Sequence, residues 1–462
     1  MMDISSHRRV PWTRVAAFIL LLLAVAEFSG RGLVRGLRSG GDFNDFLSPY
    51  VQSRAWVSGA DPYSPKSLVD FWPEGAPKFE FLRREAENGT LLVNRGMPTA
   101  YTPSCLMLVA PFSFLPWLVA TKLWLLMSSL LLVGWIFLLI PQDWDWYETR
   151  SLTFLALALA LAPLHTGLAT ANPAIPAAAL GGIGVCLLRR SHAAITAALL
   201  GVSIILKPQI GLCFLIFAVV KGCWKTAIWA MGGVTAATLL AILRMQVSHT
   251  NWIASYVVDN RALFSGGMLT DFTASNPTRW GLINAQLLAY TFLGNRSAAN
   301  EAAWLIFITL GFLWLFWAVR SVSGADDPLL DLAAMLVLSL LPIYHRFYDA
   351  VVLIVPLAWI LKEWHRQHAF TRLGVSFALA PFLVPGGTLL EVLQSKGRIP
   401  PSIANSWWWQ MMVLPHEVWA LMGLSFLLLY AMAPNKRQAA AKEGTYSTAD
   451  TRPQAQVLEQ AS

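Results

Sequence analysis

The sequence predicts an all-α polytopic membrane protein, and three observations lead to this fold class. Of the 462 residues, 56% are hydrophobic and only 13% are charged. Several apolar stretches approach or exceed the roughly 20 residues that a helix needs to cross a bilayer. The net charge of +8 comes from short basic clusters between these stretches, such as Lys221/Lys225 and Lys362/Arg366. Such clusters indicate cytoplasmic ends of membrane segments, so we expect contacts with membrane lipids and no nucleic-acid partner.

The N-terminal segment is basic and leads into an apolar run over residues 15–28. Ala24-Val25-Ala26 matches the cleavage site of a secretory signal, but the many apolar segments that follow favour an uncleaved first helix with a cytoplasmic start. Hydrophobicity then falls over residues 30–102, where Pro, Gly and charged residues predict a long first extracytoplasmic loop. A loop of this length inside a membrane domain is usually functional.

The rest of the chain predicts a bundle of about 10–12 transmembrane helices in a single membrane domain over residues 1–433. Residues 101–116 contain three prolines and predict a short interfacial or re-entrant helix. Further outer loops are expected at about 246–300 and 386–410, and residues 434–462 predict a disordered cytoplasmic tail. The expected spans lie near residues 117–140, 151–170, 173–188, 224–245, 301–320, 329–343, 347–362, 370–385 and 411–432.

Residues 192–220 differ from the other segments because Lys207 and Pro208 interrupt them in the middle. Proline ends a helix, and the flanking Arg190 and Lys221 hold both ends on the cytoplasmic side, so we expect a hairpin with Lys207 at its outer tip. A lysine in an apolar segment costs on the order of 3 kcal/mol on insertion scales and usually marks a functional cavity. A lysine that snorkels to the interface would explain the same pattern.

Counting segments from a cytoplasmic start brings several polar side chains to the outer side of the membrane. Asp42 and Asp45 lie there in the first loop, and a carboxylate at the rim of an apolar cavity suits removal of a proton from a hydroxyl. A helix cap or a solvated acid remains an alternative for both. The same count places Asn172, Lys207, Gln209, Asn276, Arg279, His345, Arg346 and Tyr348 on that side.

The run Tyr344 to Asp349 concentrates His345 and Arg346 between two apolar segments. Arginine suits phosphate binding, and His345 could hydrogen-bond to a phosphate or a sugar. A structural pair with Asp349 that closes a turn is the alternative. For Asn276 and Arg279, the sequence is equally compatible with a role in a turn and with contacts to a sugar.

The sequence lacks the motifs of nucleotide and metal chemistry. It contains no Walker loop, GxGxxG or HExxH, and its four cysteines show no CxxC spacing. Nucleotide-sugar chemistry therefore lacks support, and an outward cavity would need a donor carried by a lipid.

Five stretches occur in an order that resembles glycosyltransferase family 87, of the GT-C superfamily, over about residues 15–360. This family is similar to polyprenol-phosphate-mannose-dependent mannosyltransferases. The chain departs from the usual family pattern at Ala171-Asn172 and in its last motif. The stretches are DFLSPYVQSRAWVSGADPY (45–63), YTPSCLMLVAPFSFLP (101–116), LKPQIGLCFLIFAVVKGCWK (206–225), SNPTRWGLINAQL (275–287) and LPIYHRFYDAVVLIVPL (341–357).

The resemblance implies an inverting transferase with a GT-C-like bundle. In the family, an acid in the first outer loop deprotonates the acceptor. The spacing from that acid to the tripeptide at 61–63 fits Asp45 and not Asp42, and the family's Lys-Pro pair matches Lys207 and Pro208. Lys207, Arg346 and His345 would bind the donor phosphate, while Asp42, Asn172, Gln209, Asn276, Arg279 and Tyr348 are possible sugar or acceptor contacts.

We therefore expect a plasma-membrane enzyme with both termini cytoplasmic and an outward-facing site. It would move a hexose such as mannose from a polyprenyl-phosphate donor to a lipid or glycan acceptor, without metal or cofactor. A transporter or flippase of lipid-linked glycans, a polysaccharide polymerase or ligase, and an inactive assembly subunit remain alternatives.

Overall fold

The computed structural model describes residues 11–38, 45–76, 101–145, 147–188, 192–320 and 328–433. Asp42, Arg190 and the C-terminal tail lie outside these ranges. The described residues are helical and contain no strand beyond one isolated bridge between Leu282 and Arg346. With several helices long and apolar enough to cross a bilayer, the protein is an all-helical polytopic membrane protein, as predicted.

The sequence led us to expect 10–12 transmembrane helices. The described residues contain about half that number of unbroken spans, or fewer. Four helices pass by length and composition, or six if each of two bent pairs forms one span. The remaining apolar segments form shorter helices of 10–17 residues. The four spans are Trp12–Arg38, Trp117–Leu139 (α7), Trp224–Val247 (α13) and Arg296–Arg320 (α16).

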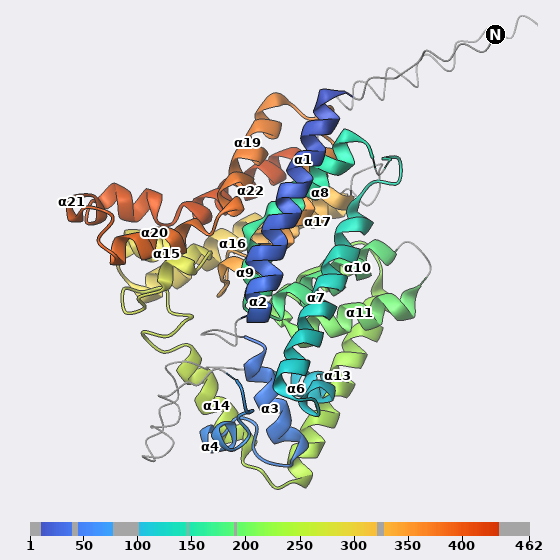
Figure 1. Ribbon diagram of the computed structural model, residues 1–462, viewed down its shortest axis with the longest axis vertical. Helices are drawn as coiled ribbons and strands as arrows, with labels where there is room; N and C mark the ends of the chain where they lie inside the picture. The colour runs from blue at the N-terminus through green and yellow to red at the C-terminus, as the bar shows by residue number, and fades with distance from the viewer. Residues whose placement is uncertain are drawn as a thin grey trace, which may run out of the picture.

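The first span extends beyond the expected loop boundary at residue 30. Helix α1 (Trp12–Glu27) continues through π-helical turns at Phe28–Val34 into α2 (Arg35–Arg38). A Cβ atom on Gly36 would lie only 2.7 Å from the carbonyl oxygen of Leu168, so the glycine allows α2 to approach this neighbouring segment closely. Figure 1 shows α2, which begins with Arg35, in the middle of the molecule beyond the end of α1.

Two of the expected outer loops pack against each other. Helices α3 (Leu47–Val57), α4 (Pro65–Asp70) and α6 (Pro103–Ser113) gather with α14 (Trp252–Leu263) at the lower end of Figure 1. The Ser255 hydroxyl donates to the Asp61 carboxylate at 2.6 Å, and the rings of Tyr63 and Tyr256 lie 4.8 Å apart. Residues 45–76 and 252–263 therefore lie at the same end of the bundle.

The expected hairpin around Lys207 is present. Helix α11 (Ala193–Leu206) ends at Lys207, and α12 (Pro208–Val220) begins at the following proline. A Cβ atom on Gly211 would lie 2.4 Å from the backbone nitrogen of Ile204, so the two helices touch directly beside the tip. The hairpin packs beside α13 and α10 (Ala174–Leu187).

A bend replaces the straight span expected over residues 151–170. Helices α8 (Thr149–Ala160) and α9 (Ala162–Ala169) meet at Leu161 with an angle of 47°. Pro163, in the first turn of α9, has no N–H group and cannot continue the hydrogen bonding of α8. The bend directs the end of α9 toward the tip of the hairpin.

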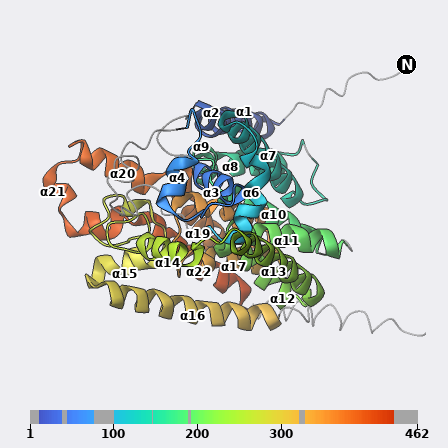
Figure 2. The same cartoon turned by 90° about the horizontal axis from the view of Figure 1, so that it is seen from below.

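The C-terminal half surrounds a buried centre. Helix α17 (Pro328–Ser339), the 3₁₀ helix Phe347–Leu353 and α18 (Ile354–Lys362) are almost wholly buried. In the view of Figure 2, α16 runs along one edge of the molecule and α21 projects from another. The surrounding helices are α15 (Ala285–Leu293), α19 (Ala369–Leu379), which continues as a 3₁₀ helix over Ala380–Leu383, α20 (Gly386–Ser395), α21 (Pro401–Ala404) and α22 (His416–Met432), with short helical turns at Arg279–Gly281 and Trp409–Val413.

Candidate active site

A cavity of about 730 Å³ lies where α9, the hairpin tip, the 3₁₀ helix Phe347–Leu353 and α20 meet. Its walls come from segments that are far apart in the sequence, between Arg35 and Ser395. Concave sites with a few convergent polar groups are the usual form of a small-molecule site. Of the residues predicted from the sequence, Asp45, Asn172, Lys207, Gln209, Arg346 and Tyr348 line this cavity.

Asp45 is fixed to α9 from both its backbone and its side chain. Its backbone N–H donates to the carbonyl oxygen of Thr170 at 2.7 Å. Its carboxylate accepts a hydrogen bond from the side-chain nitrogen of Asn172, also at 2.7 Å. Withdrawal from bulk water raises the pKa of the Asp45 carboxyl, against the opposing effects of Asn172, Lys207 and Arg346. A carboxylate with raised proton affinity suits a general base.

The orientation of Asn172 is set by its neighbours. Ala171 adopts a left-handed conformation with φ of 51°, and its carbonyl oxygen accepts the indole N–H of Trp124 at 3.0 Å. The side-chain oxygen of Asn172 accepts from the backbone of Ala174 at 2.8 Å and from the Lys207 ammonium at 3.3 Å. Because two donors occupy the oxygen, the amide nitrogen faces Asp45.

Lys207 forms a buried ion pair with Asp349. Asp349 also accepts hydrogen bonds at 3.1 Å from the His345 ring and from the backbone N–H of Arg346. The ammonium lies 4.8 Å from the centre of the Tyr348 ring. A buried ion pair persists only when its charges are well hydrogen-bonded, and these contacts meet that need.

Arg346 is held at the cavity wall by the loop around residue 278. Its guanidinium lies 3.3 Å from the Thr278 hydroxyl and 3.4 Å from the Thr278 carbonyl oxygen. Asn276 orders that loop, because its side chain donates to the Asp271 carbonyl oxygen and accepts from the Thr278 N–H. Within the described residues, neither hydrogen bond of the guanidinium goes to a carboxylate, so its N–H groups that face the cavity remain available to an anion.

Comparison with known proteins shows the family of the chain. The sequence profile of glycosyltransferase family 87 matches residues 99–345. The chain belongs to glycosyltransferase family 87. No curated protein and no solved structure matches it. The matched range contains Asn172, Lys207 and Gln209 but ends before Arg346 and begins after Asp45, so the geometry of the cavity links those two to the family region.

Three predicted residues of this family 87 glycosyltransferase lie beside the cavity and do not line it. His345 is fully buried behind Asp349, and its second ring nitrogen has no partner among the described residues. Asn276 is buried inside its loop. The guanidinium of Arg279 stacks on the Trp280 ring at 4.5 Å. Asp42 falls outside the described residues.

Two charged residues of the enzyme's cavity were missed in the sequence. Arg35 lines the cavity because the first helix continues past residue 30, whereas the hydrophobicity pattern ended it there. Glu391 lines the opposite wall from α20, in a segment expected to be an outer loop. A signal was present: Glu391 is the one charged residue within the apolar pattern of Gly386–Ser395.

Proposed function

We propose that this family 87 glycosyltransferase transfers a hexose from a polyprenyl-phosphate donor to a hydroxyl of a lipid or glycan acceptor, with inversion. Mannose is the proposed sugar by resemblance. The observation that supports this proposal is one cavity with a partly desolvated acid, Asp45, and a guanidinium, Arg346, that has no ion pair with a carboxylate among the described residues. An inverting displacement needs a base for the attacking hydroxyl and a cation for the departing phosphate.

In this reaction, Asp45 accepts the proton of the acceptor hydroxyl while the acceptor oxygen bonds to the anomeric carbon. The bond from that carbon to the phosphate oxygen breaks, and polyprenyl phosphate leaves with the electron pair. Arg346 would contact the phosphate directly, and its planar group can hold two phosphate oxygens. The proton then passes from Asp45 to water, which regenerates the base.

Lys207 is proposed as a second phosphate contact, although Asp349 already offsets part of its charge. His345 would act through Asp349, because its ring contacts that carboxylate and lies behind the cavity wall. Gln209, Asn172 and Tyr348 are proposed contacts to sugar hydroxyls, with Asn276 and Arg279 supporting the loop that holds Arg346. The basic side chains offset the leaving-group charge, so the proposed reaction uses no metal or cofactor.

The cavity is proposed to open on the outer face of the plasma membrane, with both termini in the cytoplasm. This orientation follows from the basic clusters between the apolar segments. It also fits a donor carried by lipid, because nucleotide sugars are confined to the cytoplasm.

A transfer assay tests the proposal. Purified enzyme is incubated with radiolabelled polyprenyl-phosphate-mannose and a membrane lipid extract, and label in the acceptor lipid is measured. We expect Asp45→Asn to reduce transfer at least 100-fold, since general base catalysis contributes about 10²–10⁴. The matched control is Asp70→Asn, an exposed acid at the end of α4 outside the cavity, which should keep full transfer.

Two outcomes would contradict the assignment in different ways. If the folded wild-type enzyme transfers no sugar from any polyprenyl-phosphate hexose, the proposed donor class is wrong. If Asp45→Asn transfers at the wild-type rate, the donor class stands and the base lies elsewhere.

A further inference from the structure

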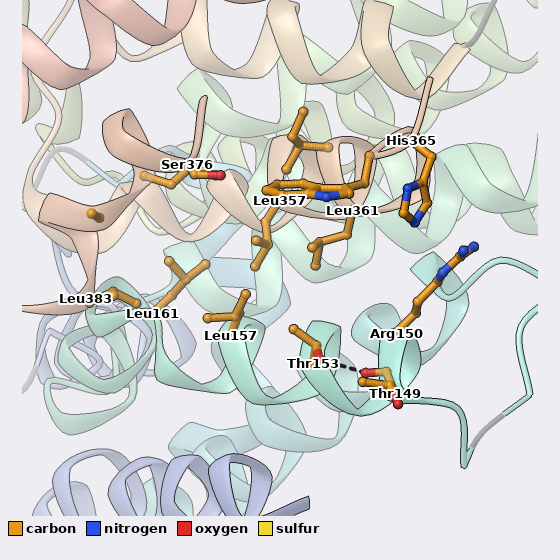
Figure 3. Close-up of a pocket in the computed structure, with 14 residues that line it drawn as sticks. Thr149, Arg150, Thr153, Leu157, Leu161, Leu357, Leu361, His365, Ser376 and Leu383 are labelled. Carbon is orange, nitrogen blue, oxygen red and sulfur yellow. Dashed lines mark hydrogen bonds between the residues drawn. The ribbon is translucent and has the colours of Figure 1, made fainter. Parts of the chain in front are cut away.

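A second cavity, of about 430 Å³, lies between α8, α18 and α19 and is shown in Figure 3. We refer to it as the α8–α18 cavity. It extends along α8 from Thr149 to the bend at Leu161, a distance of about 18 Å at 1.5 Å per residue. The hydrocarbon core of one leaflet is about 15 Å thick. The cavity therefore has the length of a single leaflet.

The interior of the α8–α18 cavity is apolar. Figure 3 shows Leu157, Leu161, Leu357 and Leu383 along its length. The Thr153 hydroxyl donates to the carbonyl oxygen of Thr149 at 2.7 Å, so it does not require a water molecule. Water gains few hydrogen bonds in such a space, whereas a hydrocarbon chain would restore the dispersion contacts that an empty cavity forfeits.

One end of this cavity carries the Arg150 guanidinium beside the His365 imidazole. Arg150 and His365 lie together at the same end of Figure 3, away from Leu161 and Leu383. Among the residues that the structure describes, neither side chain has an ion pair or hydrogen bond. The nearby Arg366 instead shares its charge with Glu363 at 3.4 Å. Within the described part of the chain, the Arg150 guanidinium is thus available to an anion at the end of the apolar channel, with the His365 ring beside it as a hydrogen-bonding group.

We propose that the α8–α18 cavity binds one acyl chain of an anionic phospholipid, whose phosphate contacts Arg150 and His365. An apolar channel one leaflet long with a guanidinium and an imidazole at one end matches the charge and shape of such a lipid. Basic pockets between transmembrane helices are known to bind anionic headgroups.

This site is separate from the catalytic cavity, although both use the same bent helix pair. Arg150 lies at the start of α8, whereas Thr170, after α9, lines the catalytic cavity. About 20 residues of helix separate them, roughly 30 Å before the bend is considered. A donor whose phosphate reacts beside Arg346 therefore cannot place that phosphate at Arg150.

Lipid binding by the full-length purified enzyme tests the proposal. Native mass spectrometry would measure retention of phosphatidylglycerol, phosphatidylcholine with the same acyl chains, and polyprenyl phosphate, each titrated separately. We expect wild type to retain phosphatidylglycerol most strongly. Arg150→Gln should weaken its binding about fivefold, the effect of one basic residue near an anionic headgroup. The matched control is Lys225→Gln, an exposed lysine outside the cavity, which should leave binding unchanged.

A second variant keeps the test decisive if Arg150→Gln disturbs folding. Ser376→Phe would fill the channel from α19 without changing its charge, and we expect it to abolish retention of phosphatidylglycerol. Equal retention of phosphatidylcholine by wild type would overturn the proposal. Preferential retention of polyprenyl phosphate, or wild-type retention by both folded variants, would overturn it as well.

Discussion

In its proposed role as the base, Asp45 has to be ionised, yet its surroundings disfavour the ionised form. Withdrawal from water raises the pKa of its carboxyl, and the hydrogen bond from Asn172 opposes this effect. The balance leaves a carboxylate that is more basic than one in water but still hydrogen-bonded. The Asn172 contact therefore tunes the base as well as orienting it.

The raised pKa of Asp45 predicts where activity is lost on acidification. The protonated carboxyl cannot accept the acceptor's proton, so kcat/KM should rise with pH and level off above the raised pKa. We expect the midpoint of this acid limb above the ordinary aspartate value of about 3.9. Asn172→Ser removes a contact that lowers the pKa and should shift the midpoint further upward. A pH profile of transfer measures both, and a limb that stays unmoved in Asn172→Ser would contradict the tuning role.

The buried pair of Lys207 and Asp349 predicts a stability effect that can be separated from catalysis. Lys207→Met leaves an unpaired buried carboxylate and should reduce the free energy of unfolding by about 3–5 kcal/mol. Asp349→Asn in the same chain removes that charge and keeps the shape, so the double variant should regain most of the stability without regaining transfer. Denaturation in detergent measures the stability of both variants. Equal stability of the single and double variants would contradict the pairing.

Most of the charged residues at the cavity were predictable because charge is rare in this chain. Lys207 and Arg346 each stand out against apolar surroundings, and counting membrane segments brings them to the same side as Asp45. Arg35 was not predictable in this way, because its position depends on the close approach of α2 to Leu168 that Gly36 allows. The inward direction of Glu391 likewise depends on how α20 packs.

At the scale of elements, the α11–α12 hairpin decides where Lys207 lies. The close contact of the two helices depends on the absence of a side chain at Gly211, whose added Cβ would meet the backbone of Ile204. The added atom would meet backbone and not a flexible side chain, so the neighbour cannot easily move aside. The glycine thereby holds the hairpin closed beside the cavity.

Gly211→Ala should therefore destabilise the enzyme and reduce transfer together. We expect a loss of about 1–3 kcal/mol in the free energy of unfolding, the usual range for overpacking. Gly232→Ala on α13 is the matched control, because its added Cβ meets nothing within 4 Å, and it should leave stability equal or slightly higher. Thermal unfolding in detergent compares the two, and similar melting temperatures would contradict the close packing.

The presence of helices was easier to predict than the points at which they break. The hairpin followed from Lys207 and Pro208, where charge and proline coincide. The bend at Leu161 was missed because residues 151–170 are predominantly apolar, and average hydrophobicity does not record the backbone effect of Pro163. Packing against neighbours then allows short broken helices where the composition suggests one straight span.

At the scale of the whole molecule, regions that the sequence assigns to separate outer loops contact one another. Residues 45–76 contact α14, and a Cβ on Gly387 would lie 2.4 Å from the Trp280 carbonyl oxygen, so the third loop region joins the second. These contacts bring the three regions close together in the described part of the chain, and the side of the membrane that they face stays a prediction.

The orientation of the whole enzyme can be measured by cysteine labelling. Starting from a variant that lacks the partly exposed Cys186 and Cys223, Glu74→Cys should react with a membrane-impermeant maleimide in intact cells. Lys225→Cys should react only after permeabilisation, because basic residues between spans favour the cytoplasmic side. The opposite pattern would place the catalytic cavity in the cytoplasm and contradict the proposed orientation.

The spread of the cavity wall along the sequence has a consequence for biosynthesis. Asp45 is made early, but the wall is completed by Arg346 and then by Thr388 to Ser395, close to the C-terminal end of the described residues. A chain that is still being inserted therefore holds the proposed base without the proposed contacts to the leaving group. Under the proposed mechanism, transfer begins only when translation and membrane insertion are nearly complete, so we expect truncated chains to be inert and unable to consume the donor.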